Sequence, residues 1–406
     1  MSLKPRPVVE DVYWVGVNDD VRELFESLWP LPFGISYNAY VVIGREAVAL
    51  IDTVDSRFTY EYIGKVREVV GDFDRIRYIV VNHLEPDHHG ATPDILGIMP
   101  KARLVTSQMG SRVLSSIYRI SSNRIIVIKD GDRIDLGGKT LRFIYTPWLH
   151  WPETMVTYLE EDKVLFSCDA FGSYGSLQDG IFDDELDMDF YLDEAKRYFS
   201  NIVIKYTRNV LEALEKLKNT EIRIIAPSHG PIYRSDPRKI VELYRRWSQP
   251  SPERDRVALI YGSMYGRGET IVEHIIEKLS QKNLKIIPHN VSTSHPSYIL
   301  SDLVESYITV FVYPSYDAGI FPYMEDVMRI FQLKQIGRGR YAAIVNIYAW
   351  ASTAKQTIEL LTKAGFRIIE PIVETKAIPD EEELKKIETL INNIVDTSRR
   401  ESTSSQ

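Results

Sequence analysis

Four side chains of the kinds that bind metal ions occur within six residues in the first quarter of the chain. His83, Glu85, Asp87 and His88 follow the apolar run 78–81, which predicts a strand that ends in a metal-binding loop. Three further candidate ligands, which also follow apolar runs, lie downstream: His150, Asp169 and His229. Seven ligands are too many for one tetrahedral ion, so we expect two metal ions.

Each of these residues by itself has a simpler explanation, because a single His or Asp after a strand is usually a turn residue or a helix cap. Together they would bury so much charge that the site would be costly without a metal. We expect the adjacent His89 to support the ligands from outside. Cys168, beside Asp169, is expected to pack as a small apolar residue.

The elements that must position these ligands are short strands in the first part of the chain, residues 1–249. Apolar runs separated by Gly or Asp turns predict strands that include residues 39–43, 47–51, 125–128 and 164–167. Helical periodicity appears near 57–70 and 203–217. We expect two sheets with helices outside them, an arrangement in which several strand ends meet at one edge.

A Pro-rich polar stretch, residues 250–256, is the expected linker to a second domain at 257–396. Strand and helix patterns alternate there, which indicates a parallel sheet. The predicted strands are residues 257–261, 308–313 and 342–347, and the predicted helices are 269–281, 324–333 and 353–365. The polar end of the chain, residues 397–406, is expected to be a disordered tail.

Composition limits the class of protein. The chain has 406 residues, 44% of them hydrophobic, and a net charge of −8, which argues against nucleic acid as a partner. Neither a membrane-spanning run nor a signal peptide is evident. The single cysteine excludes an intrachain disulfide framework. We therefore expect a cytoplasmic protein that does not bind membranes.

The seven candidate ligands resemble the pattern of the metallo-β-lactamase superfamily, which usually reads His-x-His-x-Asp-His, followed by His, Asp and His. Glu85 stands where the second His of that pattern would be. Imidazole-rich sites suit zinc, whereas an added carboxylate favours harder, redox-active ions such as iron or manganese. This one difference favours redox chemistry over hydrolysis.

The motif His-x-Glu-x-Asp-His, joined to a flavodoxin-like second domain, resembles the flavodiiron protein family over residues 8–395. Residues 34–40, 150–155 and 168–172 support the resemblance. It implies an α/β fold: an αββα metallo-β-lactamase-like sandwich that holds two irons, then a flavodoxin-like doubly wound parallel sheet that binds FMN. It implies that His83, Glu85 and His150 bind one iron. It also implies that Asp87, His88 and His229 bind the other iron, that Asp169 bridges both, and that Tyr198 lies close by as a proton or hydrogen-bond donor.

Three loops at neighbouring strand ends of the second domain are expected to hold FMN, where ligands bind in open α/β sheets. The first resembles a phosphate loop, although it is poorer in Ser and Thr than is usual in the family. The expected contacts are Ser263, Met264, Tyr265, Gly266, Arg267, Gly268, Pro314, Ser315, Tyr316, Asp317, Ala318, Gly319, Tyr348, Ala349, Trp350 and Ala351.

The resemblance implies an enzyme that reduces dioxygen to water, nitric oxide to nitrous oxide, or both, with electrons relayed through FMN to the diiron centre. The chain has no Cys-x-x-Cys pair, so the electron donor is expected to be separate: a rubredoxin, a reduced deazaflavin or a flavin reductase. Family members pair head-to-tail, which implies a homodimer or a dimer of dimers.

Two other functions remain open from the sequence. The first is a zinc or mixed-metal hydrolase of the metallo-β-lactamase superfamily, with a metal-bound hydroxide as nucleophile. The second is an electron carrier or gas sensor that binds FMN and iron without turnover. Metal content, visible colour and gas consumption distinguish these two functions from the reduction of dioxygen or nitric oxide.

Overall fold

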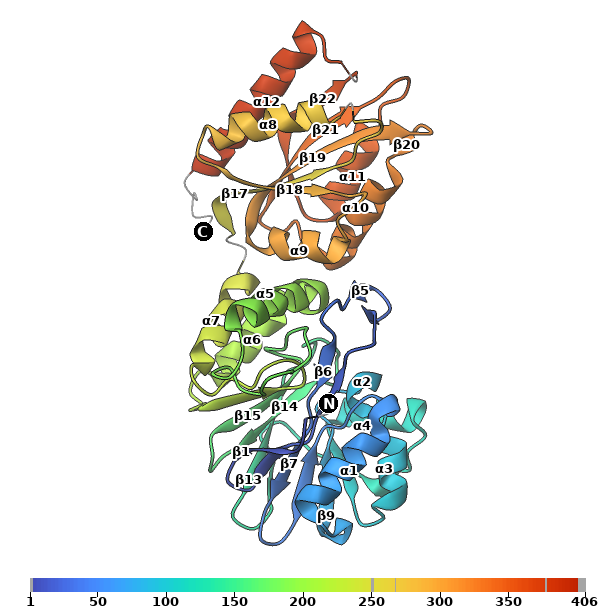
Figure 1. Cartoon of the computed structure of the whole chain (residues 1–406), viewed down its shortest axis with the longest axis vertical. Coiled ribbons are helices and arrows are strands. Elements are labelled where there is room, and N and C mark those ends of the chain that lie inside the picture. Colours follow the sequence, from blue (N-terminus) through green and yellow to red (C-terminus); the bar gives the residue numbers. More distant parts are fainter. Residues whose placement is uncertain (1–2, 250–251, 267, 377, 401–406) are drawn as a thin grey trace. The chain divides into compact units, whose positions relative to one another are not determined.

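The chain forms two compact units, residues 1–245 and 246–406 (Figure 1). The computed structural model describes residues 3–249, 252–266, 268–376 and 378–400. The division lies inside helix α7 (Pro237–Ser248), slightly before the predicted boundary. None of the described helices combines the length and hydrophobicity needed to cross a bilayer.

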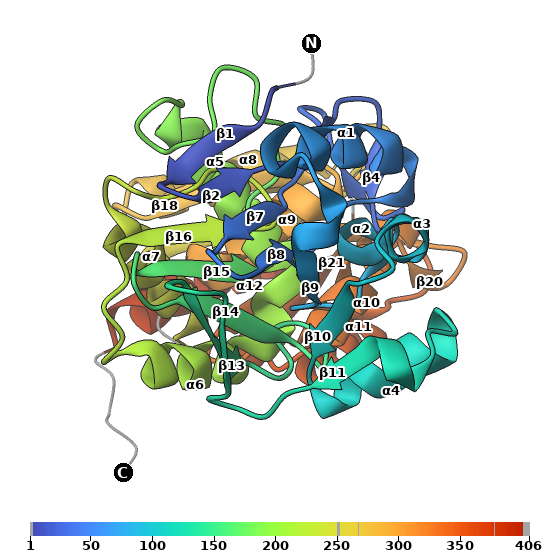
Figure 2. The ribbon, with the colours of Figure 1, turned by 90° about the horizontal axis from the view of Figure 1, so that it is seen from below.

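The first unit contains two sheets that lie between two groups of helices (Figure 2). The larger sheet contains β1 (Arg6–Val9), β2 (Val12–Trp14), β7 (Tyr40–Ile43), β8 (Val48–Ile51), β9 (Ile76–Val80), β10 (Arg103–Thr106) and β11 (Ile125–Val127), in that order. The smaller sheet contains β12 (Arg133–Asp135), β13 (Thr140–Tyr145), β14 (Met155–Leu159), β15 (Val164–Cys168) and β16 (Ile224–Pro227), in that order. Two short pairs join β3 (Val17–Asp19) to β6 (Ile35–Tyr37) and β4 (Leu24–Phe25) to β5 (Trp29–Pro30).

Helices cover the outer faces of these two sheets, as the sequence predicts. On the side of the larger sheet lie α1 (Thr59–Val70), α2 (Pro86–His89), α3 (Thr92–Ile98) and α4 (Gln108–Ile117) (Figure 2). On the side of the smaller sheet lie α6 (Thr207–Leu217) and α7 (Figure 2), and Figure 1 shows α5 (Met188–Tyr198) grouped with these two helices. The predicted helix at 203–217 is shorter, because a π-helical turn (Phe199–Val203) and a 3₁₀ turn (Ile204–Tyr206) precede α6.

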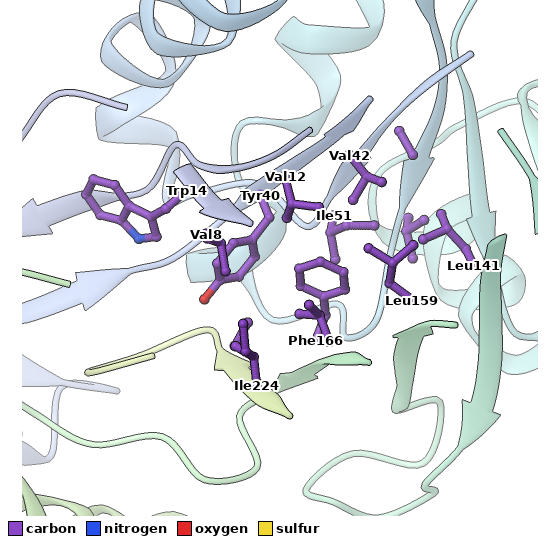
Figure 3. Close-up of a cluster of buried hydrophobic side chains, with 14 of the residues drawn as sticks. Val8, Val12, Trp14, Tyr40, Val42, Ile51, Leu141, Leu159, Phe166 and Ile224 are labelled. Atoms are coloured by element: carbon purple, nitrogen blue, oxygen red, sulfur yellow. The ribbon is translucent and has the colours of Figure 1, made fainter. Parts of the chain in front are cut away.

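The core of the first unit fills the space between the facing sheets (Figure 3). Alternate residues of each strand point inward, as the two-residue period of a β-strand requires. Tyr40 and Val42 of β7 face Phe166 of β15, and the Tyr40 and Phe166 rings lie 5.1 Å apart between their centroids. This packing gives the sandwich a rigid interior, so the loops at the strand ends have a fixed base.

The second unit is a doubly wound sheet of five parallel strands. Its order is β18 (Lys285–Asn290), β17 (Glu253–Tyr261), β19 (Ser306–Tyr316), β21 (Tyr341–Ile347) and β22 (Arg367–Thr375), and the short β20 (Gly319–Ile320) pairs with β19. Helices α8 (Glu269–Ser280) and α12 (Glu381–Arg399) cover one face (Figure 1). Helices α9 (Pro296–Glu305), α10 (Pro322–Lys334) and α11 (Ala354–Lys363) cover the other. This strand order is that of flavodoxin-like folds, so the predicted fold class is confirmed.

Two predicted boundaries of the second unit are wrong. Strand β17 begins at Glu253, so residues 253–256 belong to the sheet rather than to a linker. Helix α12 continues to Arg399, with Thr397 and Ser398 buried, so residues 397–399 are helical rather than part of a tail. Residues 250–251 and 401–406 lie outside the described part of the chain.

Candidate metal centre

The predicted ligands lie at the carboxyl ends of strands. Strand β14 is antiparallel to β13 and β15, and β16 is parallel to β15, so β13, β15 and β16 run in the same direction. Their carboxyl ends therefore share one edge of the smaller sheet. His150 follows β13 by five residues, Asp169 directly follows β15, and His229 follows β16 by two. The loop after β9 in the larger sheet and the short helix α2 supply the other four ligands.

The first group of predicted ligands consists of His83, Glu85, His150 and Asp169. Each offers one ligand atom, and these four atoms lie within 4.8 Å of one another. Glu85 Oε2 lies 3.0 Å from His150 Nε2 and 3.4 Å from His83 Nε2. Both contacts are within hydrogen-bond distance, and the same nitrogen and oxygen atoms are close enough together to surround one ion.

Asp87, His88 and His229 form the second group. His229 Nε2 lies 3.3 Å from one oxygen of Asp87, and His88 Nε2 lies 3.5 Å from the other. All three side chains are buried. Both groups of side chains that the structure brings together have the members that the family resemblance implies for the two irons.

Asp169 lies between the two groups, and each of its oxygens faces a different pair of histidines. Its Oδ2 lies 3.5 Å from His83 Nε2 and 3.4 Å from His150 Nε2. Its Oδ1 lies 2.9 Å from His88 Nε2 and 3.4 Å from His229 Nε2. One carboxylate placed in this way is able to bridge two metal ions.

Hydrogen bonds from outside the cluster fix two of the histidine rings. His83 Nδ1 donates to Glu153 Oε1 at 2.8 Å, and His229 Nδ1 donates to the carbonyl oxygen of Ser36 at 2.8 Å. Each bond leaves Nε2 free to face the centre, which is how a neighbouring acceptor sets the tautomer of a metal-binding histidine. The ligand search from sequence did not single out Glu153 or Ser36, although both lie within stretches that resemble the family.

His89 supports the loop from outside the centre. Its Nε2 donates to Asp52 Oδ1 at 3.1 Å, and its Nδ1 pairs with the Thr92 hydroxyl at 2.9 Å. Asp52 also accepts a hydrogen bond from the backbone N–H of Asn82, directly before His83. This network holds the start of the ligand loop and agrees with the supporting position expected for His89.

Tyr198 ends helix α5, directly before the π-helical turn, and points at the bridging position. Its hydroxyl donates to Asp169 Oδ1 at 2.9 Å. Burial and the nearby carboxylates raise the pKa of Tyr198 well above its ordinary value, so this hydroxyl keeps its proton. π-helical turns are frequent at functional sites.

The carboxylates of this cluster favour the protonated, positively charged form of its histidines. Burial alone lowers the pKa of His83, but hydrogen bonds to Glu153 and Glu85 and the charge of Asp169 outweigh it and raise the pKa to about 10. The same balance raises the pKa of the other three rings, to about 10 for His229 and about 9 for His88 and His150. A site with this electrostatic character attracts cations.

The second unit has a cavity of about 490 Å³ at the carboxyl ends of its central strands. Three aromatic side chains at this cavity are exposed: Tyr265 at 99%, Trp350 at 76% and Tyr316 at 48%. The predicted residues that line it are Ser263, Met264, Tyr265, Gly268, Pro314, Ser315, Tyr316, Asp317, Tyr348, Ala349 and Trp350. All three predicted loops therefore contribute to one cavity.

Some predicted contacts are not among the lining residues: Gly266, Ala318, Gly319 and Ala351. Arg267 lies outside the described residues. Lys376, which follows β22, does line the cavity, and its ammonium lies 4.0 Å from the centre of the Tyr348 ring. Sequence reasoning did not find Lys376 because it considered only the three loops.

Comparisons with known proteins agree with this architecture. A family model described as "ODP family beta lactamase" matches residues 35–230. A nitric oxide reductase from Moorella thermoacetica is 29% identical over 94% of this chain and 96% of its own length. Among solved structures, a mutant flavo di-iron protein from Thermotoga maritima is 32% identical, covers 98% of this chain and all of its own, and has a TM-score of 0.89. The rubredoxin oxygen:oxidoreductase of Desulfovibrio gigas is 25% identical, covers 98% of this chain and 99% of its own, and has a TM-score of 0.93.

The similarity extends over both units and matches the order in which they occur. It agrees with the ligand cluster of the first unit and the parallel sheet of the second. The chain therefore belongs to the flavodiiron protein family and is an oxidoreductase.

Proposed function

We propose that this oxidoreductase reduces dioxygen to water, nitric oxide to nitrous oxide, or both, at a diiron centre. His83, Glu85 and His150 would hold one iron, Asp87, His88 and His229 the other, and Asp169 would bridge them. The observation that carries this assignment is the position of Asp169, whose two oxygens face different histidine pairs.

The residues present fit two iron ions. Among the described residues, both oxygens of Asp87 and Oδ2 of Asp169 are buried without a hydrogen-bond partner. Buried carboxylate oxygens without partners are costly, and metal ions would satisfy them. The set of four histidines and three carboxylates is harder than the histidine-rich sets that select zinc.

We further propose that the cavity of the second unit binds FMN. Ser263 Oγ is buried there without a hydrogen-bond partner among the described residues, and it precedes helix α8, where a phosphate group would be stabilised. The apolar lining and the exposed rings of Tyr316 and Trp350 suit a flat aromatic ligand. The first unit would then be the diiron domain and the second the FMN domain.

When bound, FMN and the two irons would supply the redox chemistry, since FMN passes on electrons and the irons bind the gas. The protein's own contribution is positioning. Glu153 and Ser36 hold two of the histidine rings, and the Tyr198 hydroxyl donates to Asp169 and is the closest proton source that we assign.

The names of two relatives specify the proposal further. One is called a nitric oxide reductase and the other a rubredoxin oxygen:oxidoreductase. We propose that a separate rubredoxin donates the electrons; a reduced deazaflavin and a flavin reductase are the alternatives. We place the reaction in the cytoplasm, because a single cysteine suits a reducing compartment.

We also propose that two chains pair head-to-tail, alone or as a dimer of dimers. The cavity of the second unit exposes large aromatic rings at its opening, with Tyr265 at 99% and Trp350 at 76%. A protein surface that covers these rings would shield the flavin from water, and the metal centre of a partner chain would then receive its electrons.

Metal analysis and a visible spectrum of the purified holoprotein test the proposal against its alternatives. Two irons and one FMN per chain, with consumption of either gas given a reductant, are expected. Zinc without yellow colour would instead indicate a hydrolase. Iron and flavin without consumption of either gas would indicate a carrier or a sensor.

A further inference from the structure

The ligand side chains are almost completely enclosed. The most exposed of the seven are Glu85 at 12% and His150 at 7%, and the others are exposed by 5% or less. Packing at this density leaves little room for a molecule to pass. A gas that reacts at the centre therefore needs a path through the protein.

A cavity of about 530 Å³ is lined in part by residues of α6 and α7. Its inner wall is apolar and includes Phe171, Leu214, Leu217 and Val241. Charged residues form part of its rim: Lys218, Glu221, Arg223, Arg238 and Arg245. Phe171, Leu214 and Leu217 are buried and most of the charged lining residues are exposed, so the apolar part of the lining lies deeper than the charged part.

A second, smaller void of about 10 Å³ lies deeper in the same unit. Phe171, Leu214 and Leu217 line both spaces, so these three side chains separate them. The other residues around the void are Thr146, Leu149, Val156, Ala170, Val210, Ala213 and Tyr244. A void of this size is at the lower limit for a single water-sized molecule, and an apolar wall gives a water molecule too few partners to stay.

The seven proposed ligands are not among the residues that line the inner void, but two residues of its wall are sequence neighbours of a proposed ligand. Leu149 directly precedes His150, and Ala170 directly follows Asp169. Two proposed ligands, from two different strands, are therefore each one residue from the wall of the void. The turn at Asp169 is held in place, because the Gly172 N–H donates to the Asp169 carbonyl at 3.0 Å.

We propose that the outer cavity and the inner void form the path by which a neutral diatomic gas reaches the metal centre, with Leu214 and Phe171 as its constriction. This inference rests on the proposed function. Dioxygen and nitric oxide need few hydrogen bonds and enter apolar spaces readily, whereas charged or strongly polar molecules lose their hydration there. The lining therefore also selects the gas over larger polar substrates.

Xenon and gas kinetics test the path together. In crystals of the holoprotein under xenon pressure, xenon is expected in the inner void. Leu214→Trp fills the junction and is expected to abolish xenon binding and to lower the rate constant for the reduced protein with gas about tenfold. Leu214→Ala widens the junction and is expected to raise both xenon occupancy and the rate.

Glu212→Trp is the matched control, because it places the same side chain on the exposed face of the same helix. Its xenon occupancy and rate are expected to equal those of the unaltered protein. If Leu214→Trp does not fold, Ala213→Val serves as the second variant, because it narrows the void with a smaller change. It is expected to lower both the xenon occupancy and the rate constant for the reaction with gas.

Several results would overturn the path. These are no xenon in the void of the unaltered protein, an unchanged rate in Leu214→Trp with full iron and FMN content, or an equal loss in the control. Failure of the proposed function looks different: the unaltered, iron-loaded and FMN-loaded protein would then consume neither gas.

Discussion

Glu85 is the residue that most clearly separates this centre from a zinc site. Its Oε2 contacts both histidines of the first group, at 3.0 Å from His150 and 3.4 Å from His83. We predict that Glu85→His shifts the metal preference toward zinc and lowers the turnover of either gas, because imidazole replaces a hard oxygen ligand. Metal analysis after loading with equal iron and zinc checks this. Undiminished iron content and rate would refute the role of the hard ligand.

Asp169 is the residue that we propose to bridge the two irons. We predict that Asp169→Ala depletes at least one metal and abolishes gas reduction, because it removes the oxygen ligands that face both histidine pairs. Iron content per chain is the measurement. Asp183→Ala is the matched control, since Asp183 is also buried in this unit but accepts hydrogen bonds from Arg234 and Ser235. It is expected to keep both metals, and retention of both metals in Asp169→Ala would show that Asp169 is misassigned.

The ligands could be predicted from sequence because they share a visible pattern: a metal-binding side chain just after an apolar strand. The residues that orient them could not. Glu153 lies 70 residues from His83, and the Ser36 carbonyl is 193 residues from His229. A backbone carbonyl leaves no signal in the side-chain pattern, and these partners become evident only when both sheets are in place.

At the scale of elements, the loop before α8 is the part of the second unit where we propose that the phosphate of FMN binds. Ser263 is the only Ser or Thr in the described part of this loop, and its oxygen is buried without a hydrogen-bond partner among the described residues. We predict that Ser263→Ala weakens FMN binding about tenfold, because a hydrogen bond to a charged group contributes about 1.5–3 kcal/mol. Titration of the FMN-free protein with FMN measures this. Ser292→Ala, in a loop that does not line the cavity, is the control, and equal affinity of both variants would place the phosphate elsewhere.

Strands with a continuous apolar run were predicted well, and the two edge strands of the second sheet, β18 and β22, were not. β18 is at the edge of the second sheet, contains Pro288 and ends in polar residues, so its pattern is weak. The end of α12 was mistaken for a tail because its residues are polar. In the structure, the hydroxyls of Thr397 and Ser398 donate to carbonyls of the same helix, which compensates for their low hydrophobicity.

At the scale of the whole molecule, the proposal pairs two chains head-to-tail. We predict that the protein is a dimer or tetramer and that turnover per chain falls when dilution separates the subunits, because the flavin of one chain would serve the irons of another. Light scattering and activity measured over the same concentration range check this. A monomer with full turnover would contradict the pairing.

We propose that the metal centre around Asp169 reduces a diatomic gas, and a rapid-mixing experiment tests this most directly. The iron-loaded, FMN-loaded protein is reduced without oxygen and then mixed with dioxygen or nitric oxide, and the return of the oxidised flavin absorbance is followed. We predict that at least one gas reoxidises the flavin far faster in this protein than in an iron-free sample that keeps its FMN. Reoxidation at the same rate in both samples, with both gases, would contradict the account.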